Sequence, residues 1–170
     1  TLWSADEREA IGIYEVEIDT TNKKNEEWYV NTNITYSFGS GKVTGSYGTA
    51  TAKPINDVLF TAEDESNGLG TEGELNAKGL KTLKKEIVKA QAAGILQETD
   101  WYVTRKADAG TAIPSAVSTH RAAVRTKSGE METAIDNASD VDALAALYTY
   151  TEQEDGSVTR PLGEFPVLEA

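Results

Sequence analysis

Apolar and polar residues alternate along the first third of the chain. Every second residue between positions 28 and 38 is aromatic or β-branched, which places these side chains on one side of an extended strand. Residues 39–42, Gly-Ser-Gly-Lys, are typical of a turn, and the Thr-, Ser- and Gly-rich residues 43–53 return as a second strand. The pattern therefore predicts a β-hairpin that buries one aromatic face. Its rings are those of Trp28, Tyr36 and Phe38, for which an exposed sugar-binding platform is the alternative interpretation.

Two short elements are expected before this hairpin. Ser4 followed three residues later by Glu7 is a capping-box pattern, and Gly12 stands where a helix commonly ends. Residues 13–18 then alternate between apolar and polar, as a strand does. We expect a short helix over residues 4–12 and a strand over residues 13–18.

Helical spacing begins near residue 80. One apolar row, with steps of three or four residues, predicts a helix that runs to about residue 96 and buries that row. The row consists of Leu80, Leu83, Ile87, Ala90 and Gly94. The lysines at positions 81, 84, 85 and 89 are expected on the solvent side of the same helix.

Three further helices follow from the pattern. Asp100 can cap a turn or two that carry Trp101. Pro114 opens a long helix, because a missing amide proton costs little in a first turn. A near-heptad stripe of Val117, Val124, Met131 and Ile135 marks the buried side of that helix. A last short helix is expected from Asp140 to Tyr148, capped by Ser139 or Asp140.

Together these patterns predict an α+β fold. An N-terminal antiparallel β-hairpin or small sheet is followed by a helical hairpin of two or three helices and an extended C-terminal arm. The expected domains are a β-rich domain with a short N-terminal helix over residues 1–60, an acidic Gly-rich linker over 61–76, a helical domain over 77–148 and the arm over 149–170. The arm contains two prolines and a hairpin signal at Asp155-Gly156.

Charge and composition narrow the classes of function. The 170 residues carry 28 acidic and 16 basic side chains, which gives a net charge of −12. This balance disfavours non-specific nucleic-acid binding, which needs clustered Lys and Arg. No apolar run approaches the roughly 20 residues that span a bilayer, so no membrane partner is expected. The chain has no cysteine, and it begins with Thr1, as expected either of a segment of a longer gene product or of a processed end.

Candidate catalytic and metal sites are weak in this sequence. His120 is the only histidine, and its Ser and Thr neighbours suit the first turns of a helix better than a catalytic triad, so we expect a half-buried helix residue. Residues 63–68 resemble a calcium loop only faintly, because the closing carboxylate is out of register. We therefore predict no catalytic residue, no metal site and no cofactor. A glycan hydrolase would need a cleft with two carboxylates about 5–10 Å apart.

Arginines and aromatic residues cluster between the predicted helices. Arg121 and Arg125 are four residues apart on one helix face, from which they could reach Asp100, Asp108 or the ring of Trp101. The functional interpretation is anion or carboxylate recognition, and the structural one is a set of guanidinium groups that joins two helices. We favour the structural one, and the predicted staple consists of Asp100, Trp101, Arg105, Arg121 and Arg125. Aromatic residues predicted to contact a partner are Tyr29, Tyr47, Tyr148, Tyr150 and Phe165.

The same stretches resemble a module of tailed-bacteriophage virion proteins. The residues that carry the resemblance are Thr99 to Ala107, Ile113-Pro114 and His120 to Arg125. They are similar to the helical C-terminal segments of tail-fibre and tail-fibre-assembly proteins of marine and cyanobacterial phages, where an Asp-Trp-aliphatic-Arg stretch, a Pro and a Tyr-Arg-x-x-x-Arg stretch join two helices. His120 stands where a Tyr is usual. Residues 126–128, residues 140–148 and the opening residues 2–14 extend the resemblance to about half of the chain.

The resemblance implies a non-enzymatic structural component of a phage particle. Such a protein is made in the host bacterial cytoplasm, resides in the virion in or near the tail or tail fibres, and contacts other phage structural proteins as a homo-oligomer, a trimer or a hexamer. The alternative is a tail-fibre assembly chaperone that is absent from the mature virion, because both kinds of protein share these motifs. The expected contact segments are residues 28–53 and 150–170, whose backbone can add to a sheet edge. An aromatic face that the chain's own helices leave open would be covered by a neighbouring subunit.

Overall fold

The computed structural model describes residues 3–168. The chain is mixed α+β, which confirms the predicted fold class. It divides into two units, residues 1–53 and residues 54–170, so the boundary lies at Lys53 and Pro54 and precedes the predicted linker. Each unit is described by itself below.

Unit 1 contains one short helix and five strands among its described residues. They are α1 (Ala5–Glu9), β1 (Val16–Asp19), β2 (Tyr29–Val30), β3 (Thr35–Gly39), β4 (Lys42–Ser46) and β5 (Thr51–Ala52). The predicted capping box is present, because the amide of Glu7 donates to Ser4 Oγ and the Glu7 carboxylate accepts from the Ser4 amide. The predicted short helix is therefore confirmed, although it ends before Gly12.

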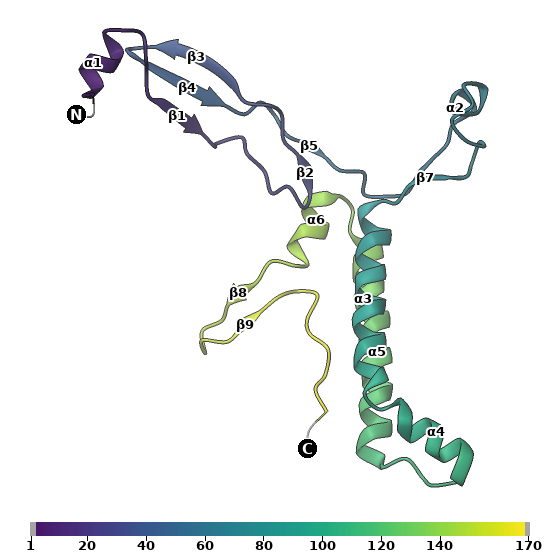
Figure 1. The fold of residues 1–170 in the computed structure, drawn as a ribbon. Coiled ribbons are helices and arrows are strands. Elements are labelled where there is room, and N and C mark those ends of the chain that lie inside the picture. The colour runs from purple at the N-terminus through teal and green to yellow at the C-terminus, as the bar shows by residue number, and fades with distance from the viewer. Residues whose placement is uncertain (1–2, 169–170) are drawn as a thin grey trace. The chain divides into compact units, whose positions relative to one another are not determined.

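The predicted hairpin is formed by β3 and β4, which pair antiparallel. Ser40 and Gly41 both have positive φ angles, of 53° and 79°, as the two central residues of a tight hairpin turn require. On its other side β4 pairs with β1 in parallel, which gives a three-stranded mixed sheet in the order β1-β4-β3 (Figure 1). The sequence pattern did not predict this parallel pairing.

Side-chain hydrogen bonds interrupt both long predicted strands. Asn31 accepts from the Lys24 amide and donates to the Lys24 carbonyl. Thr32 Oγ1 accepts from the amide of Gly48. The Thr32 bond occupies a backbone amide that would otherwise belong to a ladder. Residues 28–38 divide into β2 and β3, and residues 43–53 into β4 and β5. The short strands β2 and β5 form a separate antiparallel pair.

The predicted burial of the aromatic face is wrong for two of its three rings. Trp28 is buried, but Tyr36 and Phe38 are 62% and 61% exposed. Among the described residues of unit 1 the only helix is α1, and its five residues are too short to cover a sheet. The alternating pattern correctly indicated an apolar face, but nothing in the pattern shows whether a second layer covers it.

The acidic stretch predicted as a linker is folded. Unit 2 begins with β6 (Val58–Leu59), α2 (Ala62–Ser66) and β7 (Leu75–Ala77), and β6 pairs antiparallel with β7. Thr61 caps α2, with Asp64 as its capping-box partner. The ring of Phe60 lies against Gly70, where an added Cβ would be 2.5 Å from ring carbons. A cap and one ring over a glycine thus order a segment whose composition alone indicated a solvated chain.

The other helices in the described part of unit 2 are α3 (Leu80–Gln97), α4 (Asp100–Ala109), α5 (Ser115–Asn137) and α6 (Val141–Ala146). Helices α3 and α5 run side by side (Figure 1). The predicted stripe of α5 is confirmed as buried, and Val88, Ala92 and Leu144 complete this core. The observed α4 is ten residues long, longer than the turn or two predicted, and ends at Gly110 in the left-handed conformation.

Helix α3 buries a different face from the predicted one. Its buried residues are Leu80, Lys84, Val88 and Ala92, whereas Leu83 and Ile87 are 42% and 48% exposed. Lys84, expected on the solvent side, is buried with its ammonium 4.8 Å from the ring centroid of Tyr148. A lysine can occupy a buried row because its aliphatic stem packs in the core and its ammonium makes a cation–π contact. The prediction placed Lys84 in solvent and therefore chose the neighbouring row as the buried one.

The first turn of α3 is held by the chain segment that opens unit 2. Gly79 precedes the helix and has no side chain to cap it. The amides of Leu80 and Lys81 donate instead to the carbonyls of Pro54 and Ile55, and the Gly79 amide donates to Asp57 Oδ1 at 2.7 Å. A Cβ on Gly79 would lie 2.2 Å from the carbonyl carbon of Asn56. Glycine is required here by close backbone approach, since its φ of −77° is ordinary.

We expect the stability of unit 2 to fall in acid partly through Asp57. The hydrogen bond from the Gly79 amide, followed by one from the Thr82 hydroxyl, holds the pKa of Asp57 below its ordinary value of 3.8. A carboxyl with a lowered folded-state pKa stabilises the fold above its unfolded pKa, and this contribution is lost as the pH falls through the folded pKa. Urea midpoints followed by circular dichroism should therefore decrease below about pH 4, and less steeply in Asp57→Asn. Equal pH dependence in both proteins would contradict this role of Asp57.

The predicted arm contains a hairpin and a return to the helices. Strands β8 (Thr151–Glu152) and β9 (Val158–Thr159) pair antiparallel, with Gly156 at a positive φ in the turn between them. Leu162 is buried, and its amide donates to the carbonyl of Leu147 at 3.0 Å. The predicted hairpin signal at Asp155-Gly156 is therefore confirmed, and the segment folds back and is tied to the end of α6.

Candidate interaction surfaces

The described residues provide little for catalysis. Within residues 3–168, no group of three or more His, Asp or Glu side chains is arranged to hold a metal ion. His120 is buried within α5 at 9% exposure. None of the helices in this range is long and apolar enough to cross a membrane. Three features of the described residues are considered as interaction sites: a buried polar cluster and two exposed apolar surfaces.

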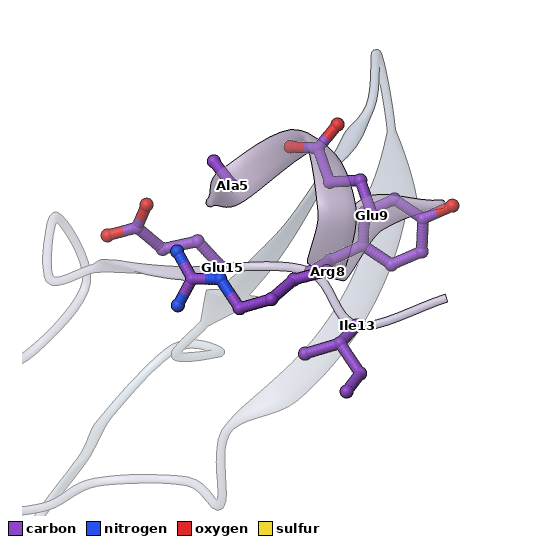
Figure 2. A pocket seen from close by; sticks show the side chains of 6 residues that line it. Ala5, Arg8, Glu9, Ile13 and Glu15 are labelled. Atoms are coloured by element: carbon purple, nitrogen blue, oxygen red, sulfur yellow. The ribbon is translucent and has the colours of Figure 1, made fainter. Parts of the chain in front are cut away.

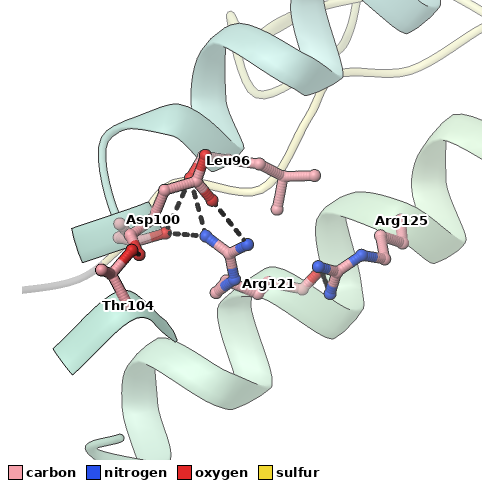
Figure 3. Close-up of polar contacts among 6 residues, drawn as sticks. Leu96, Asp100, Thr104, Arg121 and Arg125 are labelled. Atoms are coloured by element: carbon pink, nitrogen blue, oxygen red, sulfur yellow. Dashed lines mark hydrogen bonds and ion pairs between the residues drawn. The ribbon is translucent and has the colours of Figure 1, made fainter. Parts of the chain in front are cut away.

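The polar cluster joins the end of α3, the start of α4 and the first half of α5. Arg121 is 7% exposed, and its guanidinium donates to the Leu96 carbonyl at 2.7 Å, to Thr99 Oγ1 at 2.6 Å and to Asp100 Oδ1 at 2.8 Å. Figure 3 shows the guanidinium pointing into the junction between α3 and α4. Its donors are therefore used inside the fold, which favours a structural role over recognition of an external anion.

The other residues of the predicted staple lie around this cluster. Asp100 was expected to cap α4, but it is the first residue of the helix and pairs with Arg121 instead. Arg105 stacks within α4, 4.7 Å from the ring centroid of Trp101 and 5.2 Å from that of Tyr102. Arg125 is exposed, and its Nη1 reaches the Arg121 carbonyl of its own helix at 3.4 Å (Figure 3). Within the predicted staple, the ion pair of Arg121 with Asp100 connects α5 with α4.

The first apolar surface lies on the three-stranded sheet of unit 1. Residues paired directly across neighbouring strands point to the same face. Val16 and Phe38 both pair with Val43, and Ile18 and Tyr36 both pair with Gly45. These two rows define the sheet face, which consists of Val16, Ile18, Tyr36, Phe38 and Val43.

The two sides of this sheet differ sharply in polarity. Within the sheet face, Tyr36 and Ile18 lie over Gly45, where a Cβ would be 2.8 Å and 2.9 Å from their side chains, and Phe38 meets Tyr14 with ring centroids 4.6 Å apart. The opposite side carries the ion pair of Glu17 with Lys42, which raises the pKa of that lysine. Most residues of the sheet face remain exposed, so the sheet presents an apolar layer to solvent.

Mixed charges lie at one end of the sheet face. A hollow of about 140 Å³ next to α1 is lined by Ala5, Arg8, Glu9, Ile13, Tyr14 and Glu15. Figure 2 shows the side chain of Arg8 extending toward Glu15. Acidic and basic side chains therefore border the sheet face, which itself contains no charged residue.

The second apolar surface is the row of α3 that sequence analysis expected to be buried. Leu83 and Ile87 are exposed, and near Gly94 the row meets a groove of about 580 Å³ beside residues 164–167. Phe165 is half-buried in this groove, and Val167 is 84% exposed at its margin. The structure therefore places the predicted contact residue Phe165 beside α3.

The predicted contact tyrosines have different surroundings. Tyr29 and Tyr47 are half-buried, with the ammonium groups of Lys24 and Lys23 5.1 Å and 5.7 Å from their ring centroids. Tyr148 is half-buried between Lys84 and Arg160. Tyr150 is 53% exposed, and its hydroxyl donates to Glu164, a hydrogen bond that raises the pKa of this tyrosine. None of the four belongs to the sheet face.

Sequence reasoning missed the contribution of β1 to the sheet face. The alternation of residues 13–18 indicated a strand, but Val16 and Ile18 join the face only through the parallel pairing with β4, for which a single sequence gives no signal. Comparison of the chain with protein-family descriptions, curated proteins and solved structures finds no match. The surfaces described above therefore carry the functional argument.

Proposed function

We propose that this protein is a non-enzymatic structural component of a bacteriophage particle, associated with the tail or tail fibres, and that it acts through protein–protein contacts. The observation that carries the proposal is the sheet face, an apolar surface on an otherwise strongly charged chain. Exposed apolar patches of this kind mark contact sites for other proteins. The resemblance of residues 99–125 to phage tail-fibre and fibre-assembly proteins supplies the phage context.

The proposed partners are other structural proteins of the particle and further copies of this chain. The net charge of −12 disfavours phosphate backbones and anionic lipid surfaces, so nucleic acid and membrane are not proposed as partners. Within unit 2, the helical hairpin of α3 and α5 and the tied-back segment 149–168 would present the α3 row as a further contact surface. No cofactor is required for such a role.

A fibre-assembly chaperone is the second candidate, favoured by the exposed row of α3. A transient binding site in the helical unit suits a protein that holds a fibre segment and then releases it. Leu83, Ile87 and the groove beside Phe165 offer an apolar surface of moderate size for that purpose. The chaperone would be absent from the mature virion.

A quantitative mass-spectrometric inventory of purified, DNA-filled particles distinguishes the two candidates. We expect this chain at a fixed ratio to the major capsid and tail-tube proteins, in multiples of three or six copies per particle. Absence from the particles, together with abundance in the infected-cell lysate, would contradict the virion proposal and support the chaperone. Proteins of known virion and non-virion location serve as internal controls in the same samples.

A further inference from the structure

We propose that the sheet face of one chain is covered by the sheet face of a second copy of the same chain. The inference rests on the proposed function, because it names the partner in one of the contacts proposed there. It concerns the sheet of unit 1 alone and makes no use of the α3 row.

The described part of unit 1 has almost no core of its own. Among its described residues, Trp28 is the only large apolar side chain that is buried. A unit of 53 residues is small for independent stability, and a three-stranded sheet needs its apolar face packed against something. The side chains that would form such a core are present, but they point to solvent.

The size of the open surface supports the same inference. Val16, Ile18, Tyr36 and Phe38 are 46%, 42%, 62% and 61% exposed. With roughly 150–250 Å² for each aromatic residue, these side chains leave on the order of 400 Å² of contiguous surface uncovered. This lies within the roughly 300–600 Å² of the largest apolar patch on a typical monomer, a patch that is often functional, and is about half of the roughly 800 Å² that one partner contributes to a standard interface. The charged margin and the strand backbones can supply the remainder.

The composition of the sheet face identifies the partner as a copy. The sheet face carries no charge, so contact with it is driven by apolar burial, which an identical face provides equally well across a two-fold axis. A partner that recognises this chain by charge complementarity would instead bind its acidic surface. Residues 1–53 hold 8 acidic and 5 basic side chains, and so only −3 of the net −12, which keeps repulsion between two such units low.

The absence of cysteine makes this contact directly testable in the full chain. Position 36 lies on the sheet face, and position 37 is its neighbour on the opposite side of β3. We expect Tyr36→Cys to form a covalent dimer with a short bismaleimide and Ser37→Cys to remain monomeric under identical conditions. Equal cross-linking of both variants would overturn the proposal, since the contact would then not be specific to this face.

Sedimentation velocity supplies the second measurement. We expect the unmodified chain to sediment above its monomer mass of 18.3 kDa, Phe38→Lys to shift toward the monomer, and Ser37→Lys to behave as the unmodified chain. A monomeric unmodified chain at high micromolar concentration would overturn the inference. Circular dichroism of each variant, with its strand signal compared with that of the unmodified chain, checks that the sheet of unit 1 remains folded. If Phe38→Lys does not fold, the cross-linking pair still decides the question.

Failure of this inference and failure of the proposed function produce different results. A chain that is monomeric in solution but present at fixed stoichiometry in particles overturns only the self-association. A chain that self-associates through position 36 but is absent from particles overturns only the virion role.

Discussion

Replacing Arg121 with Met is expected to lower the free energy of unfolding of unit 2 by about 2–3 kcal/mol. The guanidinium donates to the Leu96 carbonyl and to the buried hydroxyl of Thr99, and both acceptors lose a charged donor in the variant. The ion pair with Asp100 adds little, because the Asp100 side chain is 58% exposed and screened by water. The Leu96 carbonyl still accepts from the Thr99 amide and hydroxyl, so the loss arises mainly at the buried Thr99 hydroxyl, whose charged donor methionine cannot replace.

Arg125→Met is the matched control for this prediction. It removes the same group from the same helix four residues later, where the side chain is exposed and makes one long hydrogen bond to its own helix. We expect a change within about 0.5 kcal/mol. Urea unfolding followed by far-ultraviolet circular dichroism measures the loss of the helices, which include α3, α4 and α5. Equal losses of unfolding free energy in the two variants would show that the stability depends on the charge of the side chain and not on its buried contacts.

Replacing Gly79 with Ala is expected to cost about 2–3 kcal/mol through steric overpacking. The new methyl group would lie 2.2 Å from the carbonyl carbon of Asn56, which is backbone and cannot rotate away. Relief requires separating residues 54–57 from the start of α3, and this breaks the bonds from Leu80 and Lys81 that satisfy the first amides of the helix. The effect should appear as a lower urea midpoint of the helical signal.

Gly94→Ala serves as the control in the opposite direction. Gly94 lies inside the same helix, and an added Cβ would meet nothing within 4 Å. Alanine has the higher helix propensity, so we expect a gain of roughly 0.5–1 kcal/mol. A loss at both positions would mean that helix α3 tolerates no added methyl group, which would refute the argument from the contact at Asn56.

Local signals in the sequence correctly predicted several elements. The capping box at Ser4, the turn at Ser40-Gly41 and the cap at Asp140 each depend on chemistry within four residues, and each is present. The stripe of α5 was equally clear, because its apolar residues lie on one side only. Such features need no knowledge of distant partners.

The errors arose where a distant partner decides the outcome. Helix α3 carries apolar residues on two neighbouring rows. The row with Lys84 is the buried one, and its burial depends on contact with Tyr148, which lies 64 positions further along the chain. Tyr36 and Phe38 alternate as buried residues do, but the layer needed to cover them is absent from the described part of unit 1. Of the predicted staple, the pairing of Asp100 with Arg121 was anticipated, whereas the stacking of Arg105 within its own helix was not.

The parallel pairing of β1 with β4 also has a kinetic consequence. Val16 pairs with Val43, 27 positions later, so at ~5–20 residues per second the ribosome needs about 1–5 s to complete the partner strand after β1 has been made. The β3–β4 hairpin closes across a two-residue turn, and such hairpins form within about 1–10 μs. β1 is therefore the first strand of the sheet to be synthesised and the last to pair with its neighbour.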